Sequence, residues 1–281
     1  MSNEEEVVTG EVIEMPEGQT ISEEMAAEER QDLKVAIIGG DNVLSSATAR
    51  AFDVPLGVEV QIFSTDGDSF DECLSWKPNI AFWCDEISVK KNDTLNDADF
   101  IAATQRLIRS SGAGVCIRSS INVETYERLM MALTREVFQN KITYMPDLSD
   151  SLNVQDIIMS PVQIIGGTGK ALEQHIQVLR GTSWFNADTL LTGTVPDAIY
   201  ARLGVSGYKM VRQKYFDELY EAVMDMKNAN PMIVNRLVCN ALGEGVTPNF
   251  VTGAQEYDGR IFAGATDTLT LIENCWCLYE L

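Results

Sequence analysis

The chain has 281 residues, of which 45% are hydrophobic, and a formal net charge of −21 from 42 acidic and 21 basic side chains. That length fits one large domain or two ordinary ones, and the hydrophobic content supplies a core, which excludes disorder of the whole chain. Nucleic acids and anionic membrane surfaces both require a basic footprint, so we expect neither as a partner. No run of apolar residues is long enough to predict a transmembrane helix.

The first 30 residues are an acidic segment that holds ten Glu and one Arg, a net charge of −9. Its composition predicts a solvated N-terminal arm. The segment has neither the basic region nor the apolar core of a signal peptide, so we expect a protein that is not secreted by that route. Residues 11–16 (Glu-Val-Ile-Glu-Met-Pro) have enough apolar content to dock on a neighbouring protein as an extended strand.

From residue 31 to residue 193, short apolar runs alternate with polar or amphipathic stretches. Residues 45–52 and 96–110 have the pattern of helices. The predicted strands are residues 34–40, 58–63, 80–84, 114–118, 141–144 and 162–166. Strands that alternate with helices imply βαβ units, so we expect an α/β fold with a Rossmann-like, doubly wound parallel sheet over residues 31–193.

Residues 194–281 are predicted to form a helical domain. Apolar residues recur every three or four positions over a long helix at about 197–227, and further helices are expected at 231–242 and from 267 onward. Gly204 and Gly207 each lower helix propensity by about 1 kcal/mol, and such glycines usually mark close packing against another helix or subunit. Aromatic side chains on the long helix favour a buried helix–helix contact between copies, although they would also fit the core of one copy: Tyr200, Tyr208, Tyr215, Phe216 and Tyr220.

The cysteines and the single histidine predict no metal or catalytic centre. The six cysteines are interpreted as free, mostly buried thiols of a reducing compartment: Cys73, Cys84, Cys116, Cys239, Cys275 and Cys277. The spacing of Cys275 and Cys277 is poor for a disulfide or a zinc site. His175 lies among polar neighbours and is interpreted as a solvated or capping residue on a helix surface.

Several segments, in order, resemble the UDP-glucose/GDP-mannose 6-dehydrogenase family. The segments are Arg-Ser-Ser-Ile-Asn-Val-Glu-Thr at 118–125, Tyr-Met-Pro-Asp-Leu at 144–148, Pro-Val-Gln-Ile-Ile-Gly-Gly at 161–167, Tyr-Phe-Asp-Glu-Leu at 215–219 and Phe-Ala-Gly-Ala-Thr-Asp-Thr-Leu at 262–269. The resemblance implies an NAD domain, a helical domain that dimerises and a nucleotide-sugar domain, which together oxidise the sugar 6-hydroxyl to a carboxylate. In that comparison the chain ends where the third domain would begin, so we expect much of the substrate site to be missing.

The positions that match the family's cofactor site are Gly39, Gly40, Asp41 and Ser64, and the last two are altered. In the Gly-x-Gly-x-x-Gly turn, Asp41 replaces the second glycine and Leu44 the third, and a carboxylate at the second position opposes a pyrophosphate. Ser64 stands where an acidic residue would hold the ribose, and Asp66 is two residues late. We therefore expect the chain to bind no cofactor. If it is an enzyme, the expected cofactor is NAD.

The positions that match the family's catalytic residues are altered as well. They are Asp147, Arg202, Ser206, Thr266 and Asp267, the last of which matches only if three residues are deleted; otherwise the position is Thr270. Thr266 replaces the nucleophilic cysteine, and a threonine hydroxyl is a poor nucleophile without a base. Arg202 replaces the lysine that stabilises the oxyanion, Ser206 replaces an asparagine and Asp147 replaces a glutamate.

These changes predict a non-catalytic structural protein derived from a nucleotide-sugar dehydrogenase. Its expected partners are further copies of itself, through residues 197–227, and a neighbouring protein bound by residues 1–30. We expect it in the cytoplasm or in a virion, for example as a phage neck, collar or decoration protein. A divergent NAD-dependent UDP-sugar dehydrogenase and a nucleotide-sensing pseudoenzyme are the alternatives.

Overall fold

The computed structural model describes residues 33–52, 58–88, 95–149, 153–160, 162–179, 182, 189–224, 230, 233–234 and 237–238. The acidic segment 1–30, the candidate positions Thr266 and Asp267, and the helix predicted from residue 267 therefore lie outside the described residues. Cys239, Cys275 and Cys277 lie outside them too.

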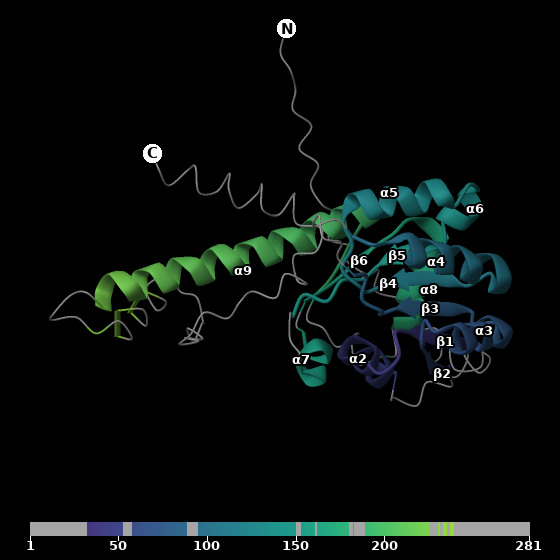
Figure 1. Cartoon of the computed structure of the whole chain (residues 1–281), viewed down its shortest axis with the longest axis horizontal. Helices are drawn as coiled ribbons and strands as arrows, with labels where there is room; N and C mark the ends of the chain where they lie inside the picture. Colours follow the sequence, from purple (N-terminus) through teal and green to yellow (C-terminus); the bar gives the residue numbers. More distant parts are fainter. Residues whose placement is uncertain are drawn as a thin grey trace, which may run out of the picture.

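A single seven-stranded sheet organises the described part of the chain, in the order β2-β1-β3-β4-β5-β6-β7 (Figure 1). The strands are β1 Leu33–Ile38, β2 Val58–Phe63, β3 Ile80–Trp83, β4 Gly114–Ile117, β5 Ile142–Tyr144, β6 Val162–Gly166 and β7 Thr189–Gly193. Strands β1 to β5 are parallel, which confirms the Rossmann-like α/β prediction.

The direction of the sheet changes after β5, which the prediction of a parallel sheet did not include. Strand β6 pairs antiparallel with β5 through Tyr144 and Gly166, and β7 then runs parallel to β6. The chain leaves β5 at its carboxyl end, passes through the short helix α7 (Val154–Ile158) and enters β6 without returning to the other edge of the sheet. Antiparallel neighbours permit such a connection, whereas parallel neighbours require a crossover.

Helices cover both faces of the sheet. The remaining helices are α2 Val43–Ala51, α3 Gly67–Trp76, α4 Ala98–Ser111, α5 Val123–Ala132, α6 Glu136–Gln139, α8 Gly169–Leu179 and α9 Val195–Met224. One apolar cluster packs α3, α4, α5 and the beginning of α9 on one face, and a second packs α2 and α8 on the other. Helix α7 lies beside α2 (Figure 1).

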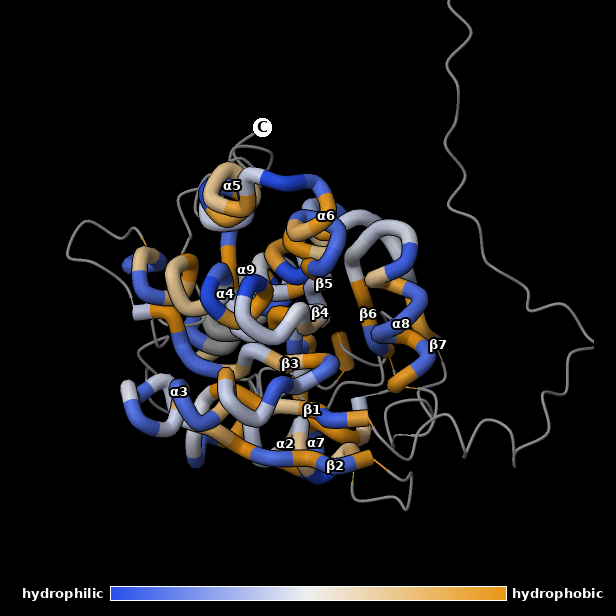
Figure 2. Tube along the Cα trace, turned by 90° about the vertical axis from the view of Figure 1, so that its right-hand side faces the viewer, coloured by the Kyte–Doolittle hydropathy of each residue, from blue (hydrophilic) through white to orange (hydrophobic). Residues whose placement is uncertain are grey.

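The central strands are buried on both faces, as their continuous apolar sequences predict. In β1, Ala36 and Ile38 belong to one cluster, and Val35 and Ile37 belong to the other; all four are fully buried. Figure 2 shows the hydrophobic colour along the strands and the hydrophilic colour on the outer turns of the helices. A two-sided core of this kind fixes the carboxyl ends of β1, β2 and β3 relative to one another.

Helix α9 extends away from the α/β body (Figure 1). It begins at Val195, two residues before the long helix predicted at 197–227, and residues 225–227 of that prediction lie outside the described part. Of the helix predicted at 231–242, only residues 233–234 and 237–238 are described, and they are helical. Within the described residues, no helix combines the length and the apolar character needed to cross a bilayer.

His175 is fully buried, so the prediction of a surface histidine is wrong. On α8 it shares the inward face with Ala171 and Val178, because residues three and four apart lie on one side of a helix. Its Nδ1 lies 2.8 Å from the carbonyl oxygen of Ala171, and its ring meets Phe82 edge-on at 6.3 Å. Burial lowers the pKa of His175 to about 4.

The prediction of buried free thiols is confirmed for the three cysteines that the structure describes. Cys73, Cys84 and Cys116 are at most 1% exposed and form no disulfide. Burial raises the pKa values of Cys73 and Cys116 to about 12 and that of Cys84 to about 11. Because only the thiolate is a good nucleophile, these side chains are predicted to be inert in the native protein.

We expect N-ethylmaleimide to leave Cys73, Cys84 and Cys116 unmodified in the native protein near neutral pH and to modify all three after unfolding in guanidinium chloride. Peptide mass spectrometry resolves each site, so labelling of the other three cysteines does not interfere. Rapid native labelling of Cys84 would contradict its burial beneath the glycine turn.

Candidate functional site

The turn that follows β1 is a tight backbone loop that depends on glycine. The amides of Gly39 and Gly40 both donate to the carbonyl oxygen of Phe63, at 2.9 and 3.0 Å, which fixes the turn to the end of β2. Gly39 has φ +155° and Gly40 has φ +60°. A Cβ on Gly39 would lie 2.5 Å from Ser45 Oγ and 2.9 Å from the amide nitrogen of Asp85, so no side chain fits there.

Asn42 joins this turn to α2 and to β3. Its Oδ1 accepts from the amide of Ser45 at 2.7 Å and so caps the first turn of α2. Its Nδ2 donates to the carbonyl oxygens of Gly39, at 3.0 Å, and Cys84, at 2.9 Å. A helix N-terminus binds anions through its exposed amides. At this terminus, one of those amides is already bonded to a side chain of the protein.

A hydrogen bond also joins the segments that follow β2 and β3. Thr65 follows β2 and Asp85 follows β3, and Thr65 Oγ1 donates to Asp85 Oδ2 at 2.8 Å. Strand β1 lies between β2 and β3, so this bond crosses over the carboxyl end of β1. The backbone oxygen of Asp85 in turn accepts from Ser119 Oγ at 2.5 Å. In open α/β sheets the ligand crevice lies at this edge, where the strand order reverses.

The other residue predicted for the cofactor site, Ser64, lies at the end of β2 as expected. Its amide donates to Ser69 Oγ at 2.9 Å, and its hydroxyl donates to Asp66 Oδ2 at 3.2 Å. The structure thus places Gly39, Gly40, Asp41 and Ser64 along one edge. It adds the carboxylates of Asp66 and Asp85 to that of Asp41, which makes this edge acidic.

The described catalytic positions gather where β5 meets α9. Arg202 and Ser206, one turn apart on α9, are 8% and 4% exposed, and Arg202 Nη1 donates to Ser206 Oγ. Tyr144, at the end of β5, is fully buried, and burial raises the pKa of its phenol to about 12. The charge of Arg202 lowers the Tyr144 pKa and that of Asp147 raises it, so both lie near the phenol.

Asp147 is held within its own loop. Its Oδ1 accepts from the amide of Ser149 at 3.0 Å and from the hydroxyl of Ser149 at 2.8 Å. The loop is fastened to α9 by Lys209 Nζ, which donates to the carbonyl oxygen of Leu148 at 2.5 Å. Asp147 and the pair Arg202–Ser206 thus lie near Tyr144, and each forms hydrogen bonds with other residues of the protein.

The sequence interpretation missed several residues that shape this site. Asn42 stands immediately before a helix and three residues before Ser45, which is a signal for an N-cap. Thr65 and Asp85 are 20 residues apart, and no spacing rule connects them. Tyr144 was part of a matched segment but was given no role. Among the described residues, no cluster of three His, Cys, Asp or Glu side chains could hold a metal ion.

Comparison with known proteins supports the fold. No family model and no curated protein sequence matches the chain. Solved structures that resemble it include a GDP-mannose dehydrogenase from Pseudomonas aeruginosa (15% identity, TM-score 0.58, 73% of this chain and 56% of that one) and a UDP-glucose dehydrogenase from Pyrobaculum islandicum (13%, 0.59, 74% and 56%). A UDP-D-ManNAc dehydrogenase from Pyrococcus horikoshii is 13% identical with a TM-score of 0.58, and the match covers 86% of this chain and 68% of that one.

The chain thus has the fold of nucleotide-sugar dehydrogenases, as the sequence resemblance implied. It spans a little more than half the length of the first two structures. At such low identity the likeness concerns the fold, and the function rests on the residues of the site.

Proposed function

We propose that the protein is a non-catalytic module built on a nucleotide-sugar dehydrogenase fold, which acts in a homo-oligomeric assembly such as a viral particle. One observation carries this proposal: the bond between Thr65 and Asp85 crosses the carboxyl end of β1, where the glycine turn begins. A dinucleotide would place its pyrophosphate at this turn. Asp41 and Asp85 would repel it there, so the residues present do not fit NAD.

The catalytic positions support the same conclusion. A residue that stabilises an oxyanion must direct its donors at the place where the charge develops. Here the Arg202 guanidinium is buried and donates to Ser206. Asp147 likewise accepts two hydrogen bonds from Ser149. Both side chains thus form hydrogen bonds within their own segment, Arg202 within α9 and Asp147 within the loop after β5.

The surface of α9 supports assembly. Tyr200, Tyr208 and Tyr215 are spaced by eight and seven residues, which places them along one side of the helix, and they are 57%, 54% and 47% exposed. A Cβ on Gly204 would meet no atom within 4 Å, so this glycine leaves room for a close neighbour. We propose that a second copy packs on this side and that residues 1–30 bind a neighbouring protein.

The absence of a dinucleotide site is tested by calorimetry with NAD⁺, NADH and UDP-glucose at about 1 mM, the upper end of ordinary KM values. We expect no heat of binding and no NADH absorbance with UDP-glucose or GDP-mannose. Hydride transfer would overturn the proposal in favour of a divergent dehydrogenase. Binding without turnover would instead identify a nucleotide-sensing pseudoenzyme.

The assembly is tested separately by light scattering coupled to size-exclusion chromatography. We expect the native chain to elute as an oligomer and the double variant Tyr208→Ser/Tyr215→Ser to shift toward a monomer. Met131→Ser, on α5, is a matched control because Met131 is 70% exposed on another part of the body. A monomeric native chain, or equal effects of the two substitutions, would contradict the role of α9.

A further inference from the structure

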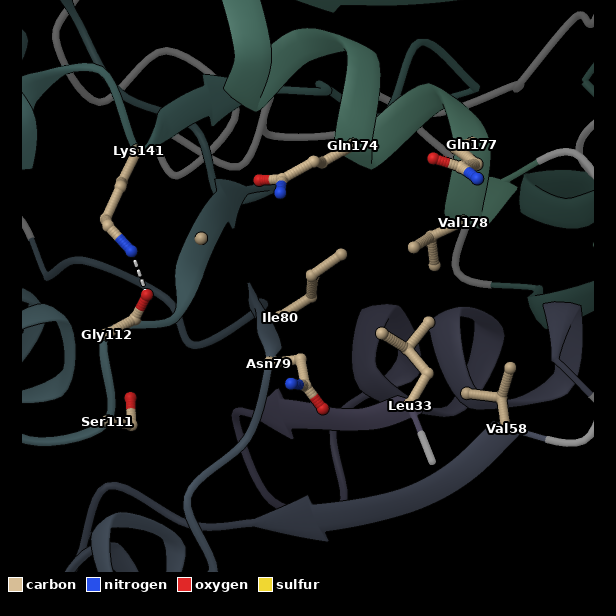
Figure 3. A pocket seen from close by; sticks show the side chains of 11 residues that line it. Leu33, Val58, Asn79, Ile80, Ser111, Gly112, Lys141, Gln174, Gln177 and Val178 are labelled. Carbon is tan, nitrogen blue, oxygen red and sulfur yellow. Dashed lines mark hydrogen bonds between the residues drawn. The ribbon is translucent and has the colours of Figure 1, made fainter. Parts of the chain in front are cut away.

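A pocket lies at the amino-terminal edge of the sheet, opposite the glycine turn. Its volume is about 470 Å³, which lies within the range of small-molecule sites. Leu33 and Val58 begin β1 and β2, Ile80 begins β3, and all three line it. Figure 3 shows Gln174 and Gln177 of α8 on the opposite side. We call this hollow the amino-edge pocket.

Lys141 carries the only charge in the described lining of the amino-edge pocket. Its ammonium donates to the carbonyl oxygen of Gly112, the residue that follows α4 (Figure 3). An ammonium has three hydrogens, so two donors remain. Partial burial lowers the pKa of Lys141, because the charged form has lost solvent. An anion bound beside the Lys141 ammonium would stabilise its charged form in place of the lost solvent.

The amide of Asn79 adds a donor in a fixed orientation. The backbone amide of Lys34 donates to Asn79 Oδ1 at 2.8 Å, which leaves Nδ2 to donate elsewhere. The backbone of Asn79 also donates to Lys34 O and accepts from Gly114, so its position is fixed on both sides. A pre-positioned donor favours binding because little conformational freedom is lost.

The rest of the wall is apolar or neutral. Leu33, Val58, Ile80 and Val178 provide aliphatic contacts, and no Asp or Glu is among the described lining residues. The chain as a whole has a net charge of −21, whereas the described lining of this pocket holds one cation and no acid. Such a lining discriminates against cations and favours an anion that carries an apolar part.

A further polar atom lies behind Gly114, beneath the wall of the pocket. Gly114 lines the pocket, and a Cβ on it would lie 3.4 Å from Nε2 of the buried His175. That Nε2 has no hydrogen-bond partner among the described residues. Because Nδ1 faces a carbonyl oxygen, Nδ1 carries the proton and Nε2 is an acceptor. A buried acceptor without a partner is a feature of binding sites as well as of strained cores.

We propose that the amino-edge pocket binds a carboxylate on a short aliphatic stem, with the carboxylate on Lys141 and Asn79 and the stem against Ile80 and Val178. Two sources present this chemistry: a free organic acid, or a glutamate side chain such as the ten in residues 1–30. The proposal is independent of whether the carboxyl edge of the sheet binds a nucleotide.

The proposal is tested by calorimetric titration of the full chain with 4-methylpentanoate, and with 4-methylpentanamide as the uncharged control. We expect the acid to bind with a Kd of about 1 mM and the amide to bind at least tenfold more weakly. Equal binding of acid and amide would overturn the assignment of the charge. To separate the two sources, the titration is repeated on a full-length variant in which the ten glutamates of residues 1–30 are glutamine.

If 4-methylpentanoate binds only to the glutamine variant, a glutamate of residues 1–30 occupies the pocket in the native chain. If it binds equally to the native chain and to the variant, the ligand is a free acid. No binding to either would overturn the proposal. Lys141→Met should weaken binding by about tenfold or more, the usual effect of losing a charged hydrogen bond. Lys170→Met is the control, because Lys170 is an exposed residue of α8 that does not line the pocket.

Lys141 also caps α4, so Lys141→Met could impair folding. The isosteric Gln174→Glu then decides, because Gln174 is exposed and the new carboxylate would repel the ligand without removing a contact of the fold. Unchanged affinity in a folded Gln174→Glu variant would overturn the proposed binding mode.

Discussion

Replacing Gly166 with alanine is expected to destabilise the fold by about 3 kcal/mol, the upper end of the usual cost of overpacking. Gly166 is the last residue of β6, and the beginning of α9 crosses directly over it. An added Cβ would lie 2.5 Å from the carbonyl oxygen of Thr194 and 2.8 Å from Val195 Cα. Both are backbone atoms, so the contact is relieved only if α9 moves away from the sheet.

Gly204→Ala is the matched control for this substitution. Gly204 lies within α9, and an added Cβ would meet no atom within 4 Å. Alanine is about 1 kcal/mol more favourable than glycine within a helix, so this variant is expected to be more stable than the native chain as a monomer. Urea unfolding followed by circular dichroism measures both variants. A Gly166→Ala variant as stable as the native chain would show that α9 does not pack on β6 as described.

Much of the sheet was predictable because its strands are buried on both faces. Residues 58–63 and 162–166 were predicted as strands with the bounds that the structure has. Helix α3, by contrast, was not predicted, since Phe70 and Cys73 are its only buried residues and its first turn is polar. The reversal at β6 was not predictable from periodicity, because strand direction depends on which edge a connection returns to.

The candidate site shows the same division between local and long-range signals. The glycine turn and its Asp41 are local features, and their place at the carboxyl end of β1 was predicted from the sequence. The bond between Thr65 and Asp85 exists because β1 lies between β2 and β3, which is a property of the sheet order. The burial of His175 was hidden by its polar neighbours at 173 and 174, which lie on the other side of α8.

That buried histidine gives the protein a specific sensitivity to acid. The pKa of His175 is about 4 in the folded protein, against 6.5 for an exposed histidine. Below pH 6.5 the unfolded chain therefore binds a proton on His175 that the folded protein does not bind. The contribution of the neutral His175 to the free energy of unfolding is thus fully present above pH 6.5 and is lost as the pH falls toward 4. The loss amounts to about 2 kcal/mol at pH 5 and about 3 kcal/mol near pH 4.

His175→Leu is expected to remove this part of the pH dependence. The substitution places an apolar side chain beside Phe82 and deletes both ring nitrogens, Nδ1 with its contact to Ala171 and Nε2, which has no partner among the described residues. Urea unfolding at about pH 7.5 and about pH 5 should show a decrease in stability that is about 2 kcal/mol smaller in the variant. The 42 acidic side chains are common to both proteins, so their titration cancels in the comparison. Since His175 is the only histidine, its single imidazole NMR signal should not shift between these pH values in the native protein. A signal that titrates near pH 6.5, or an equal pH dependence in the variant, would show that His175 is open to solvent.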